Sequence, residues 1–297
     1  MSNAKQHLEN TDITNNIWQP AKDAIHNIHL DAYSPCHKTG HTSKGDQLKW
    51  RINDMWYKAD YMGYESLSEV LVSRLLHKSS LKEPFVTYYP VEIDYSGQTF
   101  QGCASPHFLS PTQMLIPLEK LYRQYTGQSL AKKLTEFSQI HERIQYLVNQ
   151  IEAITQLKHF GAYITAMLEI DAFFLNEDRH TNNIAVIYDE QTQTYACSPL
   201  FDQGLCLFAD TKLDYPLTLS AEQCLEKIEA KPFSNNFDTQ LDAAEELYGI
   251  QLHFHFTMKN IEDELASVGI FYPQAVYKRV EDLLRIQFRK YAYLIEN

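Results

Sequence analysis

The chain has 297 residues, enough for one large domain or for two lobes that each have a hydrophobic core. Hydrophobic residues make up 44% of the sequence and charged residues 22%, as is typical of globular proteins. The formal net charge of −12 argues against a broad nucleic-acid-binding surface, which needs clustered lysine and arginine, but it allows a locally basic cleft around a phosphorylated ligand.

The five cysteines are widely spread and form no Cys-x-x-Cys pair. We therefore expect reduced thiols in a cytosol-like compartment rather than a disulfide framework or a zinc knuckle. The N-terminal stretch MSNAKQHLENTDITNN lacks the apolar core of a signal peptide, and no window approaches the roughly 20 apolar residues of a membrane span. The expected location is the cytoplasm, without membrane attachment.

In the first hundred residues the patterns predict mostly strands. Residues 1–30 are polar and expected to be only partly ordered, and 34-SPCHKTGHTSKGDQ-47 reads as a flexible loop. Two aromatic-rich strands over 48–60 should form a hairpin that turns at Asn53-Asp54. A helix is predicted over 64–78, and a second strand pair over 85–103 should turn at Ser96-Gly97.

Beyond residue 110 helical patterns dominate. The predicted helices cover 111–127, which starts at a proline and ends at a glycine, then 129–157, 161–175, a stretch near 221–230, and 259–296. The stretch 231-KPFSNNF-237 reads as a loop, and its residue types demand no particular chemical role. We expect an α+β protein with a polar segment (1–30), a small strand-rich N-lobe (31–105) and a larger, mainly helical C-lobe (106–297).

The stretch 173-FFLNEDRHTNNIAVIYDE-190 is unusually polar for a turn between two apolar runs. It follows a predicted helix and leads into the apolar strand 184-IAVIY-188, and 194-TYACSPLF-201 should return as a second strand. In such a hairpin the residue that enters the first strand lies near the residue that leaves the second. Asn183 and Asp202 should therefore be neighbours.

These polar residues suit phosphoryl transfer. Asp178 could orient and deprotonate a hydroxyl, while Asn183 and Asp202 offer the hard oxygen ligands that Mg²⁺ prefers. Protein kinases space a catalytic Asp and a metal-binding Asn as D-x-x-x-x-N, and 202-DQG-204 falls where their D-F-G would lie. The spacing alone is uninformative, since a purely structural role is common for a single Asp in a loop, and it is the combination of residues that favours a site.

With these residues the sequence resembles the HipA-like kinases, a bacterial branch of the protein kinase and phosphatidylinositol kinase-like fold. The resemblance rests on 176-NEDRHTNNIAVI-187, 199-PLFDQG-204 and 56-WYKADYMGYESLSEVLVSRLL-76. It covers about residues 35–290 and is greatest to the short members, which lack an extra N-terminal subdomain. The D-R-H-x-x-N form is also similar to lipid kinases of the phosphatidylinositol class.

The resemblance implies a two-lobed, ATP- and Mg²⁺-dependent Ser/Thr protein kinase. It makes Asp178 the catalytic base and Asn183 and Asp202 the magnesium ligands. Lys58 would contact the α- and β-phosphates, and its position between aromatic residues on a predicted strand independently suits a charge pointed into a cleft. We choose Glu69 over Glu65 as its partner on the helix because Glu69 lies deeper in the helix. His180 would contact phosphate or hold the loop by hydrogen bonds, and Arg179 would pair with a phosphate or with an acid of the C-lobe.

The nucleotide site departs from the usual kinase pattern, because the G-x-G-x-x-G motif is absent. Gly40 and Gly45 flank a short loop in which backbone N–H groups and the hydroxyls of Thr42 and Ser43 could hold phosphates. In HipA-like kinases a serine of this loop is autophosphorylated, which silences the enzyme, so Ser43 or Thr42 is the expected switch.

The adenine is expected between the lobes, beside 103-CASPHF-108 and thus Ser105. Phe201 and Ile184 are candidates for the apolar floor of that site, although each could equally be an ordinary core residue.

The expected partners are a protein substrate and, if the chain is a toxin, an antitoxin-type protein; direct nucleic-acid binding is not expected. If the chain is an effector, it would be delivered to a host cell. Three other functions compete with this one. A kinase of the same fold could phosphorylate a small molecule or a lipid, and a pseudokinase could bind nucleotide or a partner without transfer. A metal-dependent phosphoesterase would need further Asn-His and His motifs, which are missing from the sequence.

Overall fold

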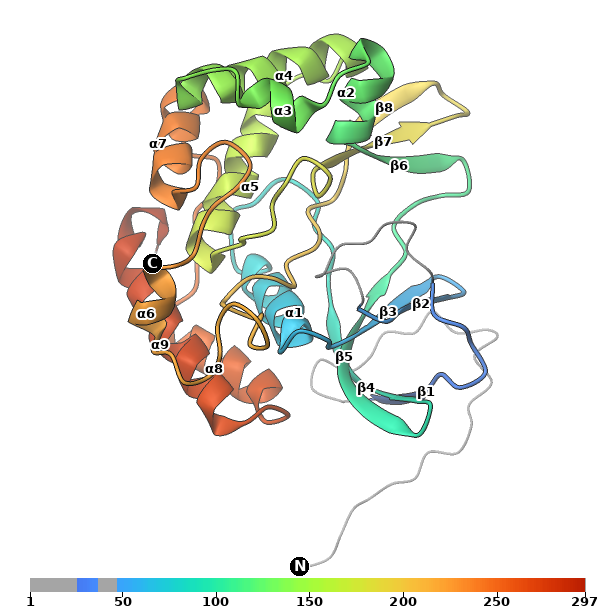
Figure 1. Ribbon diagram of the computed structural model, residues 1–297, viewed down its shortest axis with the longest axis vertical. Helices are drawn as coiled ribbons and strands as arrows, with labels where there is room; N and C mark the ends of the chain where they lie inside the picture. The colour runs from blue at the N-terminus through green and yellow to red at the C-terminus, as the bar shows by residue number, and fades with distance from the viewer. Residues whose placement is uncertain (1–25, 37–46, 297) are drawn as a thin grey trace, which may run out of the picture.

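A computed structural model describes residues 26–36 and 47–296 of the chain. Figure 1 shows the strands β1–β5 gathered in one lobe and most helices in the other. Within the described ranges, no helix is long and apolar enough to cross a membrane. The four phosphate-loop residues expected from the sequence, Gly40, Thr42, Ser43 and Gly45, lie outside the described residues.

The small lobe is built on a five-stranded sheet. Its strands are β1 (His26–His29), β2 (Lys49–Ile52), β3 (Met55–Ala59), β4 (Tyr89–Tyr95) and β5 (Gln98–Pro106), in the order β1-β4-β5-β3-β2. Both predicted hairpins are confirmed. The turn residues Asn53, Ser96 and Gly97 have φ values of 52°, 53° and 73°, the left-handed conformation that two-residue hairpin turns need. Strand β1 lies within the segment 1–30 and pairs in parallel with β4.

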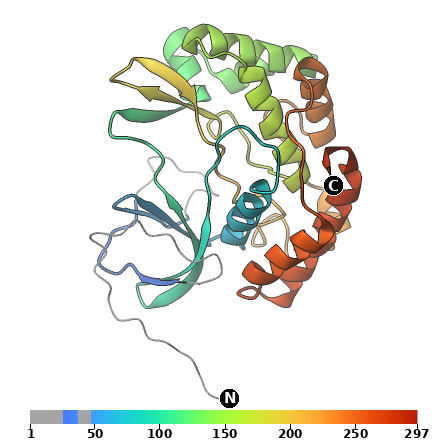
Figure 2. The same ribbon diagram turned by 180° about the vertical axis from the view of Figure 1, so that it is seen from behind.

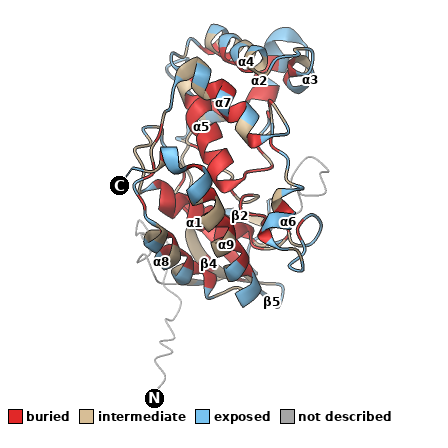
Figure 3. Cartoon of the chain, turned by 90° about the vertical axis from the view of Figure 1, so that its left-hand side faces the viewer, coloured by how far each residue is buried: buried red, intermediate tan, exposed pale blue. Residues whose placement is uncertain are grey.

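Helix α1 (Glu65–Leu76), predicted over 64–78, is buried on every side. It packs against β4 and β5 on one side and against α8 (Met258–Gly269) on another. Its apolar residues, such as Leu71, belong to the same hydrophobic core as the large lobe. The residues on the other face of the sheet, including Trp50 and Ile93, form a separate, smaller core. Figures 2 and 3 show α1 enclosed between the sheet and the C-terminal helices.

The large lobe contains a three-stranded antiparallel sheet and the remaining helices. The sheet consists of β6 (Gln113–Pro117), β7 (Ala185–Asp189) and β8 (Thr194–Cys197) in that order. The helices besides α8 are α2 (Leu118–Thr126), α3 (Leu130–Leu134), α4 (Ile140–Thr155), α5 (Phe160–Phe174), α6 (Ala221–Leu225), α7 (Phe237–Tyr248) and α9 (Gln274–Lys290), followed by the 3₁₀ turn η1 (Ala292–Leu294).

The prediction of one helix over 111–127 was wrong in its first half. The apolar run there forms β6, with Leu115 opposite Ile187 of β7. The proline that precedes the helix is Pro117 rather than Pro111. The helix does end at Gly127, which has a φ of 73° and so provides the left-handed C-cap.

Three other helix predictions also need correction. The run 129–157 is two helices, because a capping box at Gln139 starts α4. The run 259–296 is divided into α8 and α9 before Pro273. The helix predicted near 221–230 is shorter, because α6 ends at Leu225. Helix α7 was not predicted; it begins at the end of the stretch 231–237 and packs on α4 and α5.

Candidate active site

The polar loop predicted from the sequence joins α5 to β7. Helix α5 ends where Leu175 adopts a left-handed conformation, with a φ of 58°. The buried side chain of Asn176 then holds the turn, because its Oδ1 accepts a hydrogen bond from the backbone N–H of Asp178 at 3.1 Å. Its Nδ2 donates to Gln203 Oε1 at 3.1 Å, which links the loop to the segment after β8. Asn176 thus fixes the backbone that presents Asp178.

Arg179 is buried and joins the two ends of the hairpin. Its guanidinium forms an ion pair with Asp171 of α5, with Nε 2.8 Å from Oδ2 and Nη2 3.0 Å from Oδ1. Its Nη1 donates to the carbonyl oxygens of Asn183 at 3.2 Å and Phe201 at 3.0 Å. Of the two partners considered for Arg179, the structure provides the acid of the large lobe. Because Nη1 donates to both carbonyls, it holds the backbone at Asn183 beside the backbone at Phe201, next to Asp202. This is the proximity expected from the hairpin.

Asp178 and Asn183 contact each other directly. The Asn183 Nδ2 donates to the Asp178 carbonyl at 2.8 Å and to its Oδ2 at 3.0 Å, which leaves Asn183 Oδ1 as the amide atom available to a cation. The other carboxylate oxygen, Oδ1, lies 3.8 Å from His180 Nε2 and 3.7 Å from Lys231 Nζ. The buried Nδ1 of His180 has no hydrogen-bond partner among the described residues. Asp178 therefore has one oxygen fixed by an amide and one that faces the Lys231 ammonium and the His180 imidazole.

Lys58 of β3 lies between two acids from different parts of the chain. Its Nζ is 2.6 Å from Glu69 Oε1 on α1 and 3.2 Å from Asp202 Oδ1 after β8. Burial works against the ammonium charge, but Glu69 and the other nearby groups outweigh it and hold the pKa of Lys58 well above its usual value. Burial likewise opposes ionisation of Asp202, yet Lys58 and Lys49 hold its pKa below the usual range. Both charges are therefore present at neutral pH.

The two candidate glutamates of α1 have separate partners. Glu69 Oε2 also accepts the backbone N–H of Gln203 at 2.8 Å, so one carboxylate joins the sheet, α1 and the DQG segment. Glu65 instead accepts backbone N–H groups of residues 61–63, including Gly63 at 2.9 Å, just before the helix. The structure thus brings Glu69, and not Glu65, to Lys58.

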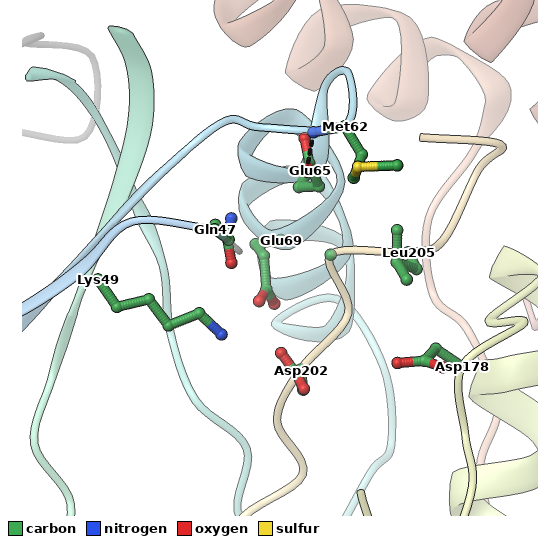
Figure 4. A pocket seen from close by; sticks show the side chains of 9 residues that line it. Gln47, Lys49, Met62, Glu65, Glu69, Asp178, Asp202 and Leu205 are labelled. Atoms are coloured by element: carbon green, nitrogen blue, oxygen red, sulfur yellow. Dashed lines mark hydrogen bonds between the residues drawn. The ribbon is translucent and has the colours of Figure 1, made fainter. Parts of the chain in front are cut away.

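These residues border a pocket between the lobes (Figure 4). The side chains of Glu69, Asp202 and Asp178 point into it from α1, the DQG segment and the polar loop between α5 and β7. Lys49 enters from the sheet, and Gln47 lies close by. Neither Lys49 nor Gln47 was singled out from the sequence. The signal for Lys49 was available, because a hairpin that turns at 53–54 places it directly opposite Lys58.

The donor set fits magnesium. In the described part of the chain no group of three or more His, Cys, Asp and Glu residues could hold a metal by itself. Mg²⁺ commonly uses only one or two protein carboxylates together with substrate phosphates and water. Asp202 and the free Oδ1 of Asn183 are oxygen donors of this kind, on two segments that Arg179 holds together.

The segment expected to hold adenine lies at the end of β5. Ser105 is buried opposite Trp56 of β3 and does not belong to the pocket lining in the described chain. The Trp56 indole N–H donates to His107 Nδ1 at 3.0 Å, which fixes the chain as it leaves the sheet. Phe201 is half-buried, with its ring 6.2 Å from that of Phe108, whereas Ile184 is fully buried in the large-lobe core.

No protein-family model matches the chain, and the comparison with curated proteins gives no match. Among solved structures, the chain is similar to the crystal structure of a Helicobacter pylori proinflammatory kinase, CtkA, with a TM-score of 0.56 and 15% sequence identity. The likeness covers 89% of this chain and 94% of that chain. It confirms the expected fold class: the protein has a kinase-like α+β fold, with a strand-rich N-terminal sheet and a mainly helical C-terminal part.

Proposed function

We propose that the protein transfers the γ-phosphoryl group of ATP, with Mg²⁺, to Ser or Thr hydroxyls of a protein substrate. The observation that carries this proposal is the arrangement of Lys58, Glu69 and Asp202 as one bonded chain, in which the two carboxylates line the pocket. Asp178 faces the same pocket from the catalytic loop. Four ionisable groups from four segments meet here, which favours a site over a structural ion pair.

The lysines suit the nucleotide. Lys58 and Lys49 lie opposite each other on β3 and β2, so two ammonium groups leave the same face of the sheet. Glu69 holds Lys58 extended, as kinases do when they position a lysine on the α- and β-phosphates. Asp202 and Asn183 would hold the magnesium ion, which when bound would neutralise charge on the phosphates.

Asp178 suits the role of general base. Its Oδ2 is oriented by the Asn183 amide, so the carboxylate keeps a fixed direction toward the pocket. The acceptor hydroxyl would give its proton to Asp178 as its oxygen bonds to the γ-phosphorus, and the bond from that phosphorus to the β–γ bridging oxygen would break. The products are a phosphorylated hydroxyl and ADP.

The test uses labelled ATP and Mg²⁺ with protein extract and phosphatidylinositol vesicles offered together. We expect label in protein with wild type, and a loss of about 100-fold or more in the Asp178→Ala and Asp202→Ala variants. Asp263→Ala, at an exposed acid of α8, is the matched control and should transfer at the wild-type rate. Transfer that persists in both site variants would refute the assignment.

The same experiment separates the competing functions. Label in lipid rather than in protein would identify a lipid kinase. Nucleotide binding without any transfer would identify a pseudokinase, and no nucleotide binding at all would overturn the kinase proposal.

We also propose that the chain phosphorylates itself at Ser43 or Thr42, on the ground of its resemblance to HipA-like kinases. Phosphopeptide mass spectrometry after incubation with Mg-ATP should find phosphate in peptides covering 34–46. Phosphate found only outside that range would contradict this part of the proposal.

A further inference from the structure

The loop between α6 and α7 brings a lysine to the proposed catalytic base. Lys231 Nζ lies 3.7 Å from Asp178 Oδ1, although the two residues are far apart in the sequence. The Lys231 side chain is 49% exposed and the Asp178 side chain 28%, so the pair lies at a surface that a substrate can reach. Lys231 is not part of the sequence motif that contains Asp178 and Asn183.

The backbone of this loop is rigidly held. Gln240 of α7 is buried, and its Nε2 donates to the Lys231 carbonyl at 3.0 Å. Its Oε1 accepts the backbone N–H groups of Phe233 at 3.3 Å and Ser234 at 3.4 Å. The fully buried Phe233 is fixed further, because its carbonyl accepts a hydrogen bond from Arg143 at 2.7 Å. These hydrogen bonds hold the loop backbone, from which the Lys231 side chain reaches Asp178.

The catalytic loop itself provides no lysine near Asp178. Its sequence from Asp178 to Asn183 is DRHTNN, and the one strong cation in it, Arg179, is buried against Asp171. Lys58 is paired with Glu69 and Asp202 and does not belong to the pocket lining in the described chain. Phosphoryl transfer places negative charge on the oxygens of the moving phosphoryl group, next to the carboxylate of the base. A cation beside Asp178 is therefore needed where these two negative groups approach.

We propose that Lys231 supplies this cation by binding the γ-phosphate and the Asp178 carboxylate at once; this inference rests on the proposed function. Before ATP binds, the Lys231 ammonium pairs with Asp178. When ATP is bound, the Lys231 ammonium lies between the Asp178 carboxylate and the γ-phosphate oxygens. There it favours transfer by stabilising the negative charge of the γ-phosphoryl group, which Lys58 does not contact. Lys231 keeps its proton throughout, and the proton of the acceptor hydroxyl goes to Asp178.

The first test measures contact rather than catalysis. The protein is treated briefly with acetic anhydride in the presence of Mg²⁺ alone, Mg-ADP, or the non-hydrolysable analogue Mg-AMP-PNP, and lysine acetylation is quantified by mass spectrometry. We expect AMP-PNP to protect Lys231 several-fold and ADP to leave it reactive, because only the analogue has a γ-phosphate. Lys49, which lines the pocket, should be protected by both nucleotides, because both carry the α- and β-phosphates. Lys227, an exposed lysine just upstream, is the control and should react equally in all three samples.

The second test compares Lys231→Ala, Lys231→Arg and Lys227→Ala in single-turnover transfer from labelled Mg-ATP. Lys231→Ala should lower the rate about 100-fold, the usual loss when one charge-stabilising donor is removed. Its KM for ATP should change far less, since other residues hold the α- and β-phosphates. Lys231→Arg should recover part of the rate, and Lys227→Ala should match wild type.

Two outcomes overturn the inference. One is equal acetylation of Lys231 with ADP and AMP-PNP while Lys49 is protected. The other is a wild-type transfer rate in Lys231→Ala. If wild type transfers no phosphate at all, the proposed function fails instead, and the acetylation pattern still decides whether Lys231 contacts a γ-phosphate.

Discussion

The ion pair between Asp171 and Arg179 makes a sharp prediction about stability. Asp171 is 0% exposed and Arg179 is 1% exposed, and two hydrogen bonds join them. In Asp171→Asn the side chain keeps its shape but loses its charge, and its amide N–H₂ faces guanidinium donors. The buried guanidinium is then left without a counter-ion, which typically costs about 3–5 kcal/mol.

The loss should be visible in both chemical and thermal unfolding. Urea titrations followed by fluorescence should show a fall of about 3–5 kcal/mol in the free energy of unfolding. For 297 residues, an unfolding entropy of about 2.1 cal/mol/K per residue converts this into a fall in Tm of roughly 5–8 °C. Faster amide hydrogen exchange over 176–184 should accompany it, because Arg179 also holds the carbonyls of Asn183 and Phe201.

The matched control is Asp282→Asn. Asp282 pairs with Lys278 on α9, but the two side chains are 41% and 70% exposed. Exposed pairs of this kind contribute about 0.3–0.5 kcal/mol, so the control should unfold nearly as wild type does. The reasoning would be refuted if Asp171→Asn lost less than about 1 kcal/mol, because the buried charge would then have found water or another partner.

Three further predictions concern Asp60, Lys49 and Asp202. Burial, and then the negative charge of Glu65, raise the pKa of the Asp60 carboxyl from 3.8 to about 7. The folded state therefore holds this proton more tightly than the unfolded chain, and its stability falls as the pH rises through that window. Asp60→Asn should remove this fall. In urea titrations, its free energy of unfolding relative to that of wild type should rise by roughly 1–3 kcal/mol between about pH 5 and pH 8; the same pH dependence in both proteins would contradict the assignment. Lys49→Ala should weaken Mg-ATP binding about tenfold in calorimetry, as loss of one phosphate contact does; unchanged affinity would exclude Lys49 from the phosphate site. In Asp202→Asn, nucleotide affinity should no longer increase when Mg²⁺ is added, and a retained Mg²⁺ response would place the ion elsewhere.

The sequence was most informative where local chemistry decides the structure. The turns at Asn53 and Ser96-Gly97 need residues that accept positive φ, and the sequence has them there. The polar loop was recognisable because Asp178 and Asn183 lie on one short segment. Lys49 could have been found in the same way, by counting residues back from the turn of its hairpin.

Long-range packing decided the parts that the sequence did not reveal. The run at 113–117 is a strand only because β7 pairs with it, and its apolar pattern alone fits a helix equally well. Helix α7 is rich in acids, and its small buried face of Leu241, Ala243 and Ala244 makes a weak signal. The approach of Lys231 to Asp178 depends on how α7 packs on α4 and α5, which no spacing rule encodes.

The burial of α1 determines what happens to the site if the lobes separate. Its side chains share one core with the large lobe, and Arg74 and Lys78, at and just beyond its C-terminal end, both pair with Glu264 of α8. The sheet has a second core of its own on its far face. If the sheet moved away from the large lobe while α1 stayed in that shared core, Lys58 would be carried off from Glu69. Opening of the cleft would then break the Lys58–Glu69 pair. A nucleotide that binds only when Lys58 is paired with Glu69 would therefore also favour the arrangement in which the two lobes are close together.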